Sequence, residues 1–165
     1  MGDNLVKYLA WKRKRAMFAD QSREDGRLVC AVTMLVDGSR MDLDGDGGPA
    51  RALIAAMEEI TRRSPFELLA YSLLPDHLNI LLAARSSGAS LRLFLTEMRL
   101  RCFKAFRKAG GKGKLWQEHY IDHTLALSEN LTLAARKMVS VPVEKGLVLK
   151  PGDWAYAWMA PKMPW

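Results

Sequence analysis

The sequence predicts an α+β fold, a ferredoxin-like βαββαβ sandwich in which helices cover one face of a largely antiparallel sheet. Two observations carry this prediction. Strand-like apolar runs and helix-like apolar stripes occur in the order strand, helix, strand, strand, helix, strand, helix. The 165 residues suffice for one domain with a packed core and are too few for two full domains. A C-terminal helix and a Trp-rich tail complete the predicted fold.

Local signals place the elements of the first half. The apolar run 28–36 predicts a buried strand that ends at an Asp-Gly turn, and the acidic loop 42–47 follows it. Pro49 opens a helix whose apolar residues recur on one face until a Ser-Pro pair ends it. The runs 66–74 and 77–83 are joined by a tight Pro-Asp turn, so they predict an antiparallel hairpin.

The elements of the second half follow from the same kinds of signal. Ser90 is the predicted cap of a basic helix, which ends at the glycine-rich segment 110–113. A fourth strand is predicted within 115–127. A short helix is predicted over 128–139, because Pro142 disfavours its continuation.

Positive charge is concentrated in the basic helix and the loop after it. The chain carries a net charge of +7, while residues 85–114 alone hold nine Lys or Arg and one acid, a net of +8. Such a stripe is typical of proteins that bind phosphate backbones, and a merely solvated helix face is the alternative. We therefore predict DNA contacts from Arg92, Arg99, Arg101, Lys104, Arg107, Lys108, Lys112 and Lys114.

Several classes of protein are excluded. The apolar runs fall far short of the ~20 residues of a membrane span, and the basic residues 12–15 follow the first apolar stretch, unlike those of a secretory signal. Cys30 and Cys102 lie in separate apolar segments and predict buried free thiols. We expect a cytoplasmic protein that makes no membrane contact.

The histidines are the candidate metal ligands. His77 begins a predicted strand, and Asn79 shares its face because side chains two apart on a strand point the same way. An imidazole beside an amide oxygen suits Mg²⁺ or Mn²⁺ only weakly, and an exposed strand-end histidine is the alternative. His119 and His123 lie too far apart on a strand to share one metal ion.

Three blocks of the sequence resemble segments of one protein family. The block AYSLLPDHLNILL at 70–82 is similar to the AYVxMPNHxHLLL segment of REP-associated tyrosine transposases, which belong to the HUH single-tyrosine transposases of small bacterial insertion sequences. LWQEHYIDH at 115–123 is similar to the xWQxxYxDHxI strand of that family. PVEKGLV followed by PGDW, within 142–154, is similar to NPVxxGLVxxPxDY. The blocks occur in the family's order.

The resemblance also implies a division of the chain. Together with the first strand and the basic helix, the three blocks cover residues 27–158. This range is the predicted transposase-like domain. It leaves a basic N-terminal arm at 1–26 and a C-terminal tail at 159–165.

The family's chemistry carries over only in part. In the family, two strand histidines and a helix amide hold a metal ion, and a tyrosine one helical turn before the amide attacks DNA. The corresponding residues here are His77, Asn79, Val141 at the amide position and Lys137 at the tyrosine position. A lysine amine forms no phosphotyrosine link, but its charge binds phosphate. The resemblance implies a transposase-like protein that binds single-stranded or hairpin DNA without cleaving it. Mg²⁺ or Mn²⁺ is expected as a cofactor only if the degenerate site still binds metal.

Two alternatives stay open at this point. An active metal-dependent endonuclease or transposase would need a displaced tyrosine, and Tyr71 and Tyr120 are the candidates. A decayed remnant or a protein-interaction module would keep the fold without specific DNA binding. The oligomeric state, monomer or dimer, is also left open.

The aromatic residues of the tail are candidates for base stacking. Trp154, Tyr156 and Trp158 alternate with alanines, so an extended tail would place three rings on one side. Such rings stack on unpaired bases with ~1–3 kcal/mol each. Rings that close the edge of the core are the alternative.

Overall fold

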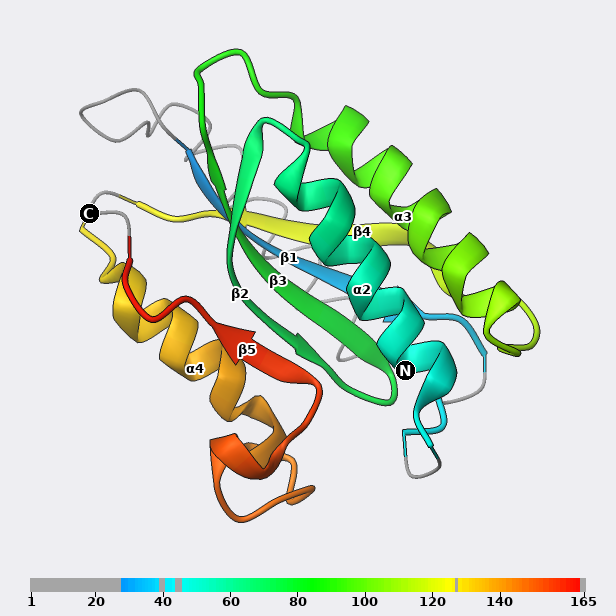
Figure 1. Ribbon diagram of the computed structural model, residues 1–165. Helices are drawn as coiled ribbons and strands as arrows, with labels where there is room; N and C mark the ends of the chain where they lie inside the picture. Colours follow the sequence, from blue (N-terminus) through cyan, green and yellow to red (C-terminus); the bar gives the residue numbers. More distant parts are fainter. Residues whose placement is uncertain (1–27, 39–40, 44–45, 127, 164–165) are drawn as a thin grey trace, which may run out of the picture.

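The centre of the molecule is one five-stranded antiparallel sheet with the strand order β4-β1-β3-β2-β5 (Figure 1). The computed structural model describes residues 28–38, 41–43, 46–126 and 128–163, so the predicted arm at 1–26 lies outside the described residues. The elements are β1 Val29–Val36, α2 Gly48–Arg62, β2 Phe66–Leu73, β3 His77–Ala84, α3 Leu91–Lys108, β4 Trp116–Thr124, α4 Leu131–Glu144, the 3₁₀ turn η1 Pro151–Asp153 and β5 Ala157–Met159. The predicted α+β fold and its order of elements are confirmed.

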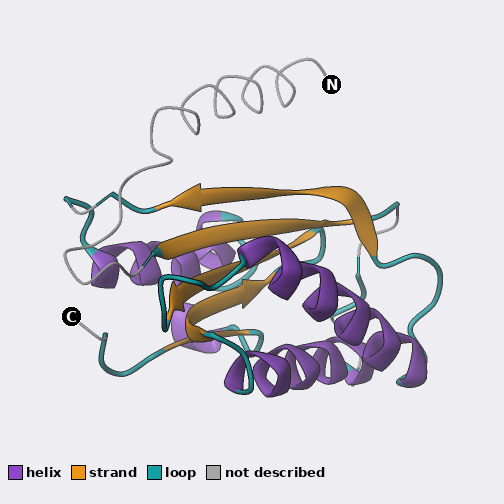
Figure 2. Cartoon of the chain, turned by 90° about the horizontal axis from the view of Figure 1, so that it is seen from above, coloured by secondary structure: helices purple, strands orange, loops and turns teal. Residues whose placement is uncertain are grey.

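The sheet has two covered faces, and alternate residues of β3 distinguish them. Leu78, Ile80 and Leu82 pack into a core with α2 and α3, which lie side by side along one face (Figures 1 and 2). Leu81 and Ala83 point to the other face, where they belong to a second core with α4. The C-terminal helix therefore forms a third layer.

α3 begins as the sequence predicts. The Ser90 hydroxyl accepts a hydrogen bond from the Leu93 amide at 3.4 Å. Phe94, Met98 and Cys102 recur on its buried face. The cap and the apolar stripe together explain why this helix has its predicted bounds.

The predicted end of the last helix is wrong, because α4 continues through Pro142 to Glu144. Pro142 lies in the final turn, where its missing N–H removes only one helical hydrogen bond. Its ring is buried, and its carbonyl accepts from the Leu147 amide at 2.9 Å. The packing of the ring and the hydrogen bond from Leu147 compensate for the helical hydrogen bond that Pro142 cannot donate.

The tail forms the edge of the sheet next to β2. β5 pairs with β2 through Ala70–Met159, Tyr71–Trp158 and Ser72–Ala157, and the Ala160 amide donates to the Leu69 carbonyl at 2.8 Å. Ordered structure therefore extends past residue 158. No helix of the described residues is long and apolar enough to cross a membrane.

Candidate nucleic-acid interface

His77 and Asn79 lie on the face of the sheet that α4 covers. On β3, Leu81 packs in one core with Ala135 of α4. Residues two and four positions before Leu81 share its side of the strand, so Asn79 and His77 point the same way. α4 packs chiefly against β2, so these two residues lie beside the helix.

A row of polar side chains crosses three strands at Asn79. Strand register makes Ser72 on β2 and Thr33 on β1 the direct neighbours of Asn79, and such neighbours share a face. The Thr33 hydroxyl donates to Asn79 Oδ1 at 2.7 Å. Ser72 is fully buried, and its hydroxyl has no hydrogen-bond partner within the described residues. Ser72 and Thr33 were not among the site residues predicted from the sequence. Their only signal was a polar residue within an apolar strand.

We expect Ser72→Ala to raise the free energy of unfolding by about 1 kcal/mol, because it removes an unpaired buried hydroxyl. Ser64→Ala is the matched control. The Ser64 hydroxyl donates to the Thr61 carbonyl at 2.9 Å and accepts from the Phe66 amide at 3.0 Å, so its loss is destabilising. Urea denaturation measures both variants. Equal destabilisation would contradict an unpaired Ser72 hydroxyl.

His77 is held by its neighbour in the sequence. Its Nδ1 lies 2.7 Å from Asp76 Oδ1. Burial raises the pKa of the Asp76 carboxyl, but the hydrogen bond and charge of His77, together with the charge of Lys145, outweigh burial and lower it. Asp76 is therefore ionised near neutral pH and orients the imidazole. The effect of Lys145 also places the C-terminal end of α4 close to this turn.

One side of α4 carries basic residues and an apolar residue, and the C-terminal end of this helix lies near Asp76. Lys137 and Val141 lie four residues apart on one side of α4, and Lys145, four residues further on, caps the C-terminal end of the helix. Lys137 and Lys145 are exposed, and Val141 is half-buried. The positions that the resemblance assigns to a nucleophile and a metal-binding amide thus hold a cation and an apolar side chain.

The residues present do not fit a divalent metal ion. One acceptor site of the Asn79 oxygen is already taken by the Thr33 hydroxyl, and Val141 supplies no ligand atom. No group of three His, Cys, Asp or Glu that could hold a metal ion occurs in the part of the chain that the structure describes. His123 instead contacts Glu129 at 3.3 Å, and His119 is exposed on β4. A cation would also meet the positive charge of Lys145.

The two tyrosines named as candidate displaced nucleophiles lie on the face of the sheet opposite His77. Tyr71 and Tyr120 both pack with the core under α2 and α3, as does Tyr156. These are the three tyrosines among the described residues, and none shares the face of His77. Burial raises the pKa of Tyr71 to about 12, and the charge and hydrogen bond of Glu58 add to the effect. A neutral, buried phenol is a poor nucleophile.

The pKa of Tyr71 predicts a loss of stability at alkaline pH. In the unfolded chain Tyr71 ionises near pH 10.0, whereas in the folded protein it stays neutral up to about 12. The stabilisation is therefore complete below pH 10 and is lost as pH rises toward 12. We expect Tyr71→Phe to reduce the fall in unfolding free energy across this range, as measured by urea denaturation. An unchanged fall would contradict the buried phenol.

The basic helix α3 lies on the face opposite His77, a placement that the sequence did not predict. Several of its predicted DNA-binding cations already have partners. The Arg99 guanidinium donates to the backbone carbonyls of Gln117 and Glu118 and so holds α3 against β4. Arg101 pairs with Glu97 at 3.4 Å. The exposed cations of α3 without an ion pair in the described residues are Arg92, Lys104, Arg107 and Lys108.

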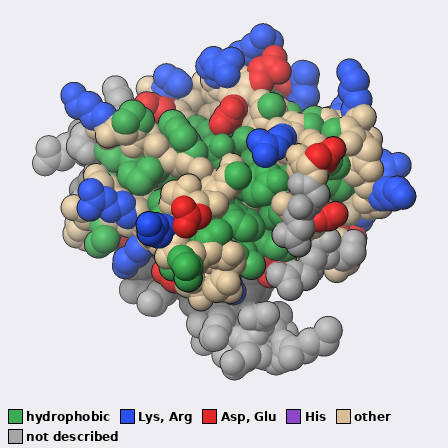
Figure 3. All heavy atoms as spheres, turned by 60° about the horizontal axis from the view of Figure 1, so that its bottom comes forward, with side chains coloured by type: hydrophobic (Ala, Val, Ile, Leu, Met, Phe, Trp, Pro, Cys, Tyr) green, Lys and Arg blue, Asp and Glu red, His purple; other side chains and the backbone are tan. Residues whose placement is uncertain are grey.

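The C-terminal end of α3 and His77 nevertheless lie at the same end of the sheet. The Val36 amide donates to the Asp76 carbonyl, and the Asp37 amide donates to the Leu115 carbonyl, each at 2.9 Å. Lys114 Nζ lies 4.0 Å from Asp37 Oδ2. The loop with Lys112 and Lys114 is therefore joined to the turn before His77 through the end of β1. Figure 3, in which the bottom of Figure 1 comes forward, shows Lys and Arg mainly at the rim of this view, around a hydrophobic centre.

The tail rings mainly close the core. Trp154 Nε1 donates to the Leu73 carbonyl at 2.9 Å, and the Tyr156 hydroxyl donates to the Leu43 carbonyl at 3.2 Å. Trp158 stacks on Tyr71 but keeps 41% of its surface exposed. Of the three predicted stacking residues, Trp158 alone is left with a large exposed ring.

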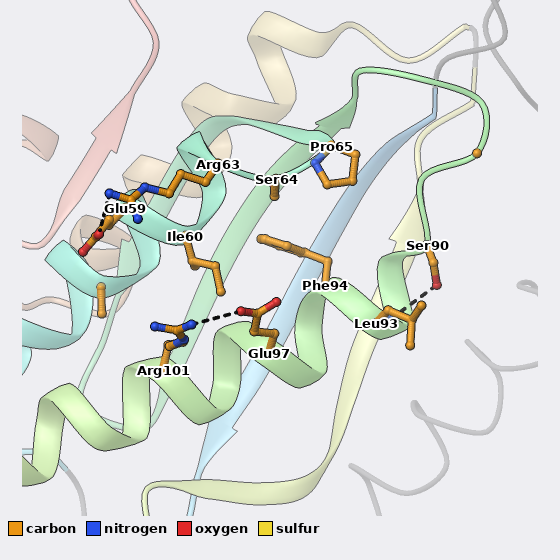
Figure 4. Close-up of a pocket in the computed structure, with 12 residues that line it drawn as sticks. Glu59, Ile60, Arg63, Ser64, Pro65, Ser90, Leu93, Phe94, Glu97 and Arg101 are labelled. Carbon is orange, nitrogen blue, oxygen red and sulfur yellow. Dashed lines mark hydrogen bonds and ion pairs between the residues drawn. The ribbon is translucent and has the colours of Figure 1, made fainter.

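A groove of about 630 Å³ lies between the C-terminal half of α2 and the N-terminal half of α3 (Figure 4). Its apolar wall includes Ile60 and Phe94, and its rim carries the ion pairs Glu59–Arg63 and Glu97–Arg101. These pairs balance the charge of the groove, so it lacks the excess positive charge that a phosphate backbone requires.

Comparisons with known proteins agree with this architecture. No family model and no curated protein sequence matches the chain. A solved structure of a REP-associated tyrosine transposase bound to a REP hairpin matches with a TM-score of 0.63 and 20% identity, covering 79% of this chain and 75% of that chain. A transposase candidate from Deinococcus radiodurans R1 matches with a TM-score of 0.52 and 18% identity, covering 70% of this chain and 90% of that chain.

The protein therefore has the fold of these transposases, here an antiparallel sheet between a pair of helices and a C-terminal helix. The similarity includes a REP-associated tyrosine transposase, the family that the three sequence blocks resemble. The comparison confirms the fold that the resemblance implied.

Proposed function

We propose that the protein binds single-stranded or hairpin DNA through the α4 side of the sheet, and that it does not cleave DNA through a phosphotyrosine. The observation that carries this proposal is the side of α4 formed by Lys137, Val141 and Lys145. It carries two exposed cations, of which Lys145 lies near enough to the His77 turn for its charge to act on Asp76, and it offers no tyrosine. Cations at this place attract a phosphate backbone whether or not strand cleavage occurs.

Two further observations support the proposal. The loop with Lys112 and Lys114 adds positive charge at the same end of the sheet. The structural neighbour described above was solved with a REP hairpin, which makes a DNA hairpin the appropriate first probe. Lys104, Arg107 and Lys108 extend the basic surface onto the opposite face.

The first test is a binding titration at two salt concentrations with a hairpin-forming single strand, an unstructured single strand and a duplex. We expect the hairpin to bind most tightly at both concentrations. If about six cations contact phosphates, the log–log salt slope for a single strand is roughly −4. Equal binding of all three probes that vanishes at the higher salt would overturn the proposal and favour a remnant that binds any polyanion.

The absence of cleavage needs its own measurement. We expect no covalent protein–DNA adduct on a denaturing gel after incubation with labelled single strand and Mn²⁺. An adduct that disappears after a single Tyr→Phe substitution would show an active enzyme with a displaced tyrosine. DNA binding and loss of cleavage are thus tested separately.

A further inference from the structure

We propose that the His77–Asn79 site contacts a DNA phosphate directly, with the Asn79 amide nitrogen as the hydrogen-bond donor and no divalent cation in between. This inference rests on the proposed DNA binding and specifies the chemistry of that site. It differs from the metal centre that the family resemblance implies, because the side chains present favour an anion over a cation.

The orientation of the Asn79 amide is the first step. Its oxygen accepts the Thr33 hydroxyl at 2.7 Å across the β1–β3 pair, so the oxygen points toward β1. The amide nitrogen consequently points away from Thr33. It makes no hydrogen bond to the described residues, and the side chain is half-buried, not sealed in the core. Asn79 therefore presents two N–H donors, which bind anions and repel cations.

The charge around Asn79 is the second step. Asp76 is the carboxylate next to the site; its Oδ1 lies 2.7 Å from His77 Nδ1, and the positive charge of Lys145 acts on it from the end of α4. Lys137 and Lys145 add two positive charges on the adjacent side of α4. A phosphate oxygen meets donors and cations here, whereas a divalent metal ion would need several oxygen or imidazole ligands that these residues do not supply.

Asn79→Asp is the variant that tests this inference. The carboxylate has almost the shape of the amide and can still accept the Thr33 hydroxyl, so the fold is preserved. It replaces the N–H donors with an acceptor and a negative charge. The two ligands should therefore respond in opposite directions: phosphate binding is lost and Mn²⁺ binding is gained.

The measurement uses the full chain without DNA. Inorganic phosphate is titrated while side-chain amide signals are followed by NMR, and the Asn79 signal is identified by its absence in Asn79→Asp. Mn²⁺ binding is titrated separately by electron paramagnetic resonance. We expect phosphate to shift the Asn79 signal in the wild-type protein, and Asn79→Asp to bind Mn²⁺ about tenfold or more tightly than wild type.

Two results would overturn the inference. One is Mn²⁺ binding by the wild-type protein at least as tight as that of Asn79→Asp, and the other is a phosphate titration that leaves the Asn79 signal unmoved. A hairpin titration in EDTA separates this inference from the proposed function. If the hairpin binds in Mn²⁺ but not in EDTA, the metal-free contact is refuted. If the hairpin binds under neither condition, DNA binding itself is refuted.

Discussion

Replacing Lys137 and Lys145 together by Gln is expected to weaken hairpin binding by roughly 20-fold at 0.1 M salt. Each lysine neutralises about one phosphate, so losing both also reduces the magnitude of the log–log salt slope by about 1.4 for a single strand. Both side chains are exposed on one side of α4, so their replacement leaves the core intact. Fluorescence anisotropy at several salt concentrations measures both quantities.

The matched control replaces Arg62 and Arg63 by Gln. These two arginines lie at the C-terminal end of α2, which packs on the opposite face of the sheet. They come just before the start of β2, and it is the other end of β2 that leads to the His77 turn. The control removes the same amount of charge, so it reports any general effect of net charge. We expect this control to weaken hairpin binding less than about threefold, because salt screens the effect of charges that lie far from the bound DNA. Equal losses in the two double variants would mean that α4 is not the interface.

Gly47→Ala is expected to lower the free energy of unfolding by about 2–4 kcal/mol. Gly47 precedes α2 with φ of 67°, a left-handed conformation that disfavours any residue with a Cβ. An added Cβ would also meet the Tyr156 hydroxyl from the C-terminal tail. The loop before α2 and the C-terminal tail thus pack too closely for any side chain at position 47. Urea denaturation measures the change.

A double-mutant cycle separates the two causes. Tyr156→Phe removes the hydroxyl that the new methyl group would meet, together with its hydrogen bond to the Leu43 carbonyl. We expect Gly47→Ala to cost less in the Tyr156→Phe background than in the wild-type protein, by about 1 kcal/mol. Purely additive costs would show that the backbone conformation alone causes the loss.

Much of the fold could be predicted because its signals are local. The hairpin of β2 and β3 follows from two apolar runs around a Pro-Asp turn, and the start of α3 follows from Ser90. The end of α4 could not be predicted in this way. Pro142 has an unfavourable local preference, and the buried packing that outweighs it involves residues distant in the sequence.

The candidate site was predicted less completely than the fold. His77 and Asn79 could be assigned to one face from strand alternation alone, and this assignment holds. Thr33 and Ser72 could not be found, because their proximity to Asn79 depends on the register of three strands. The charge of α3 was evident, but its position on the opposite face was not.

The order of the main elements, the antiparallel hairpin and the concentration of positive charge could be predicted from the sequence, because periodicity, turn residues and charge are properties of neighbouring residues. The face that each helix covers, the orientation of Asn79 by Thr33 and the placement of the described tyrosines away from His77 became evident only in the folded chain. These features arise from contacts between segments far apart in the chain, whose register depends on how the whole core packs.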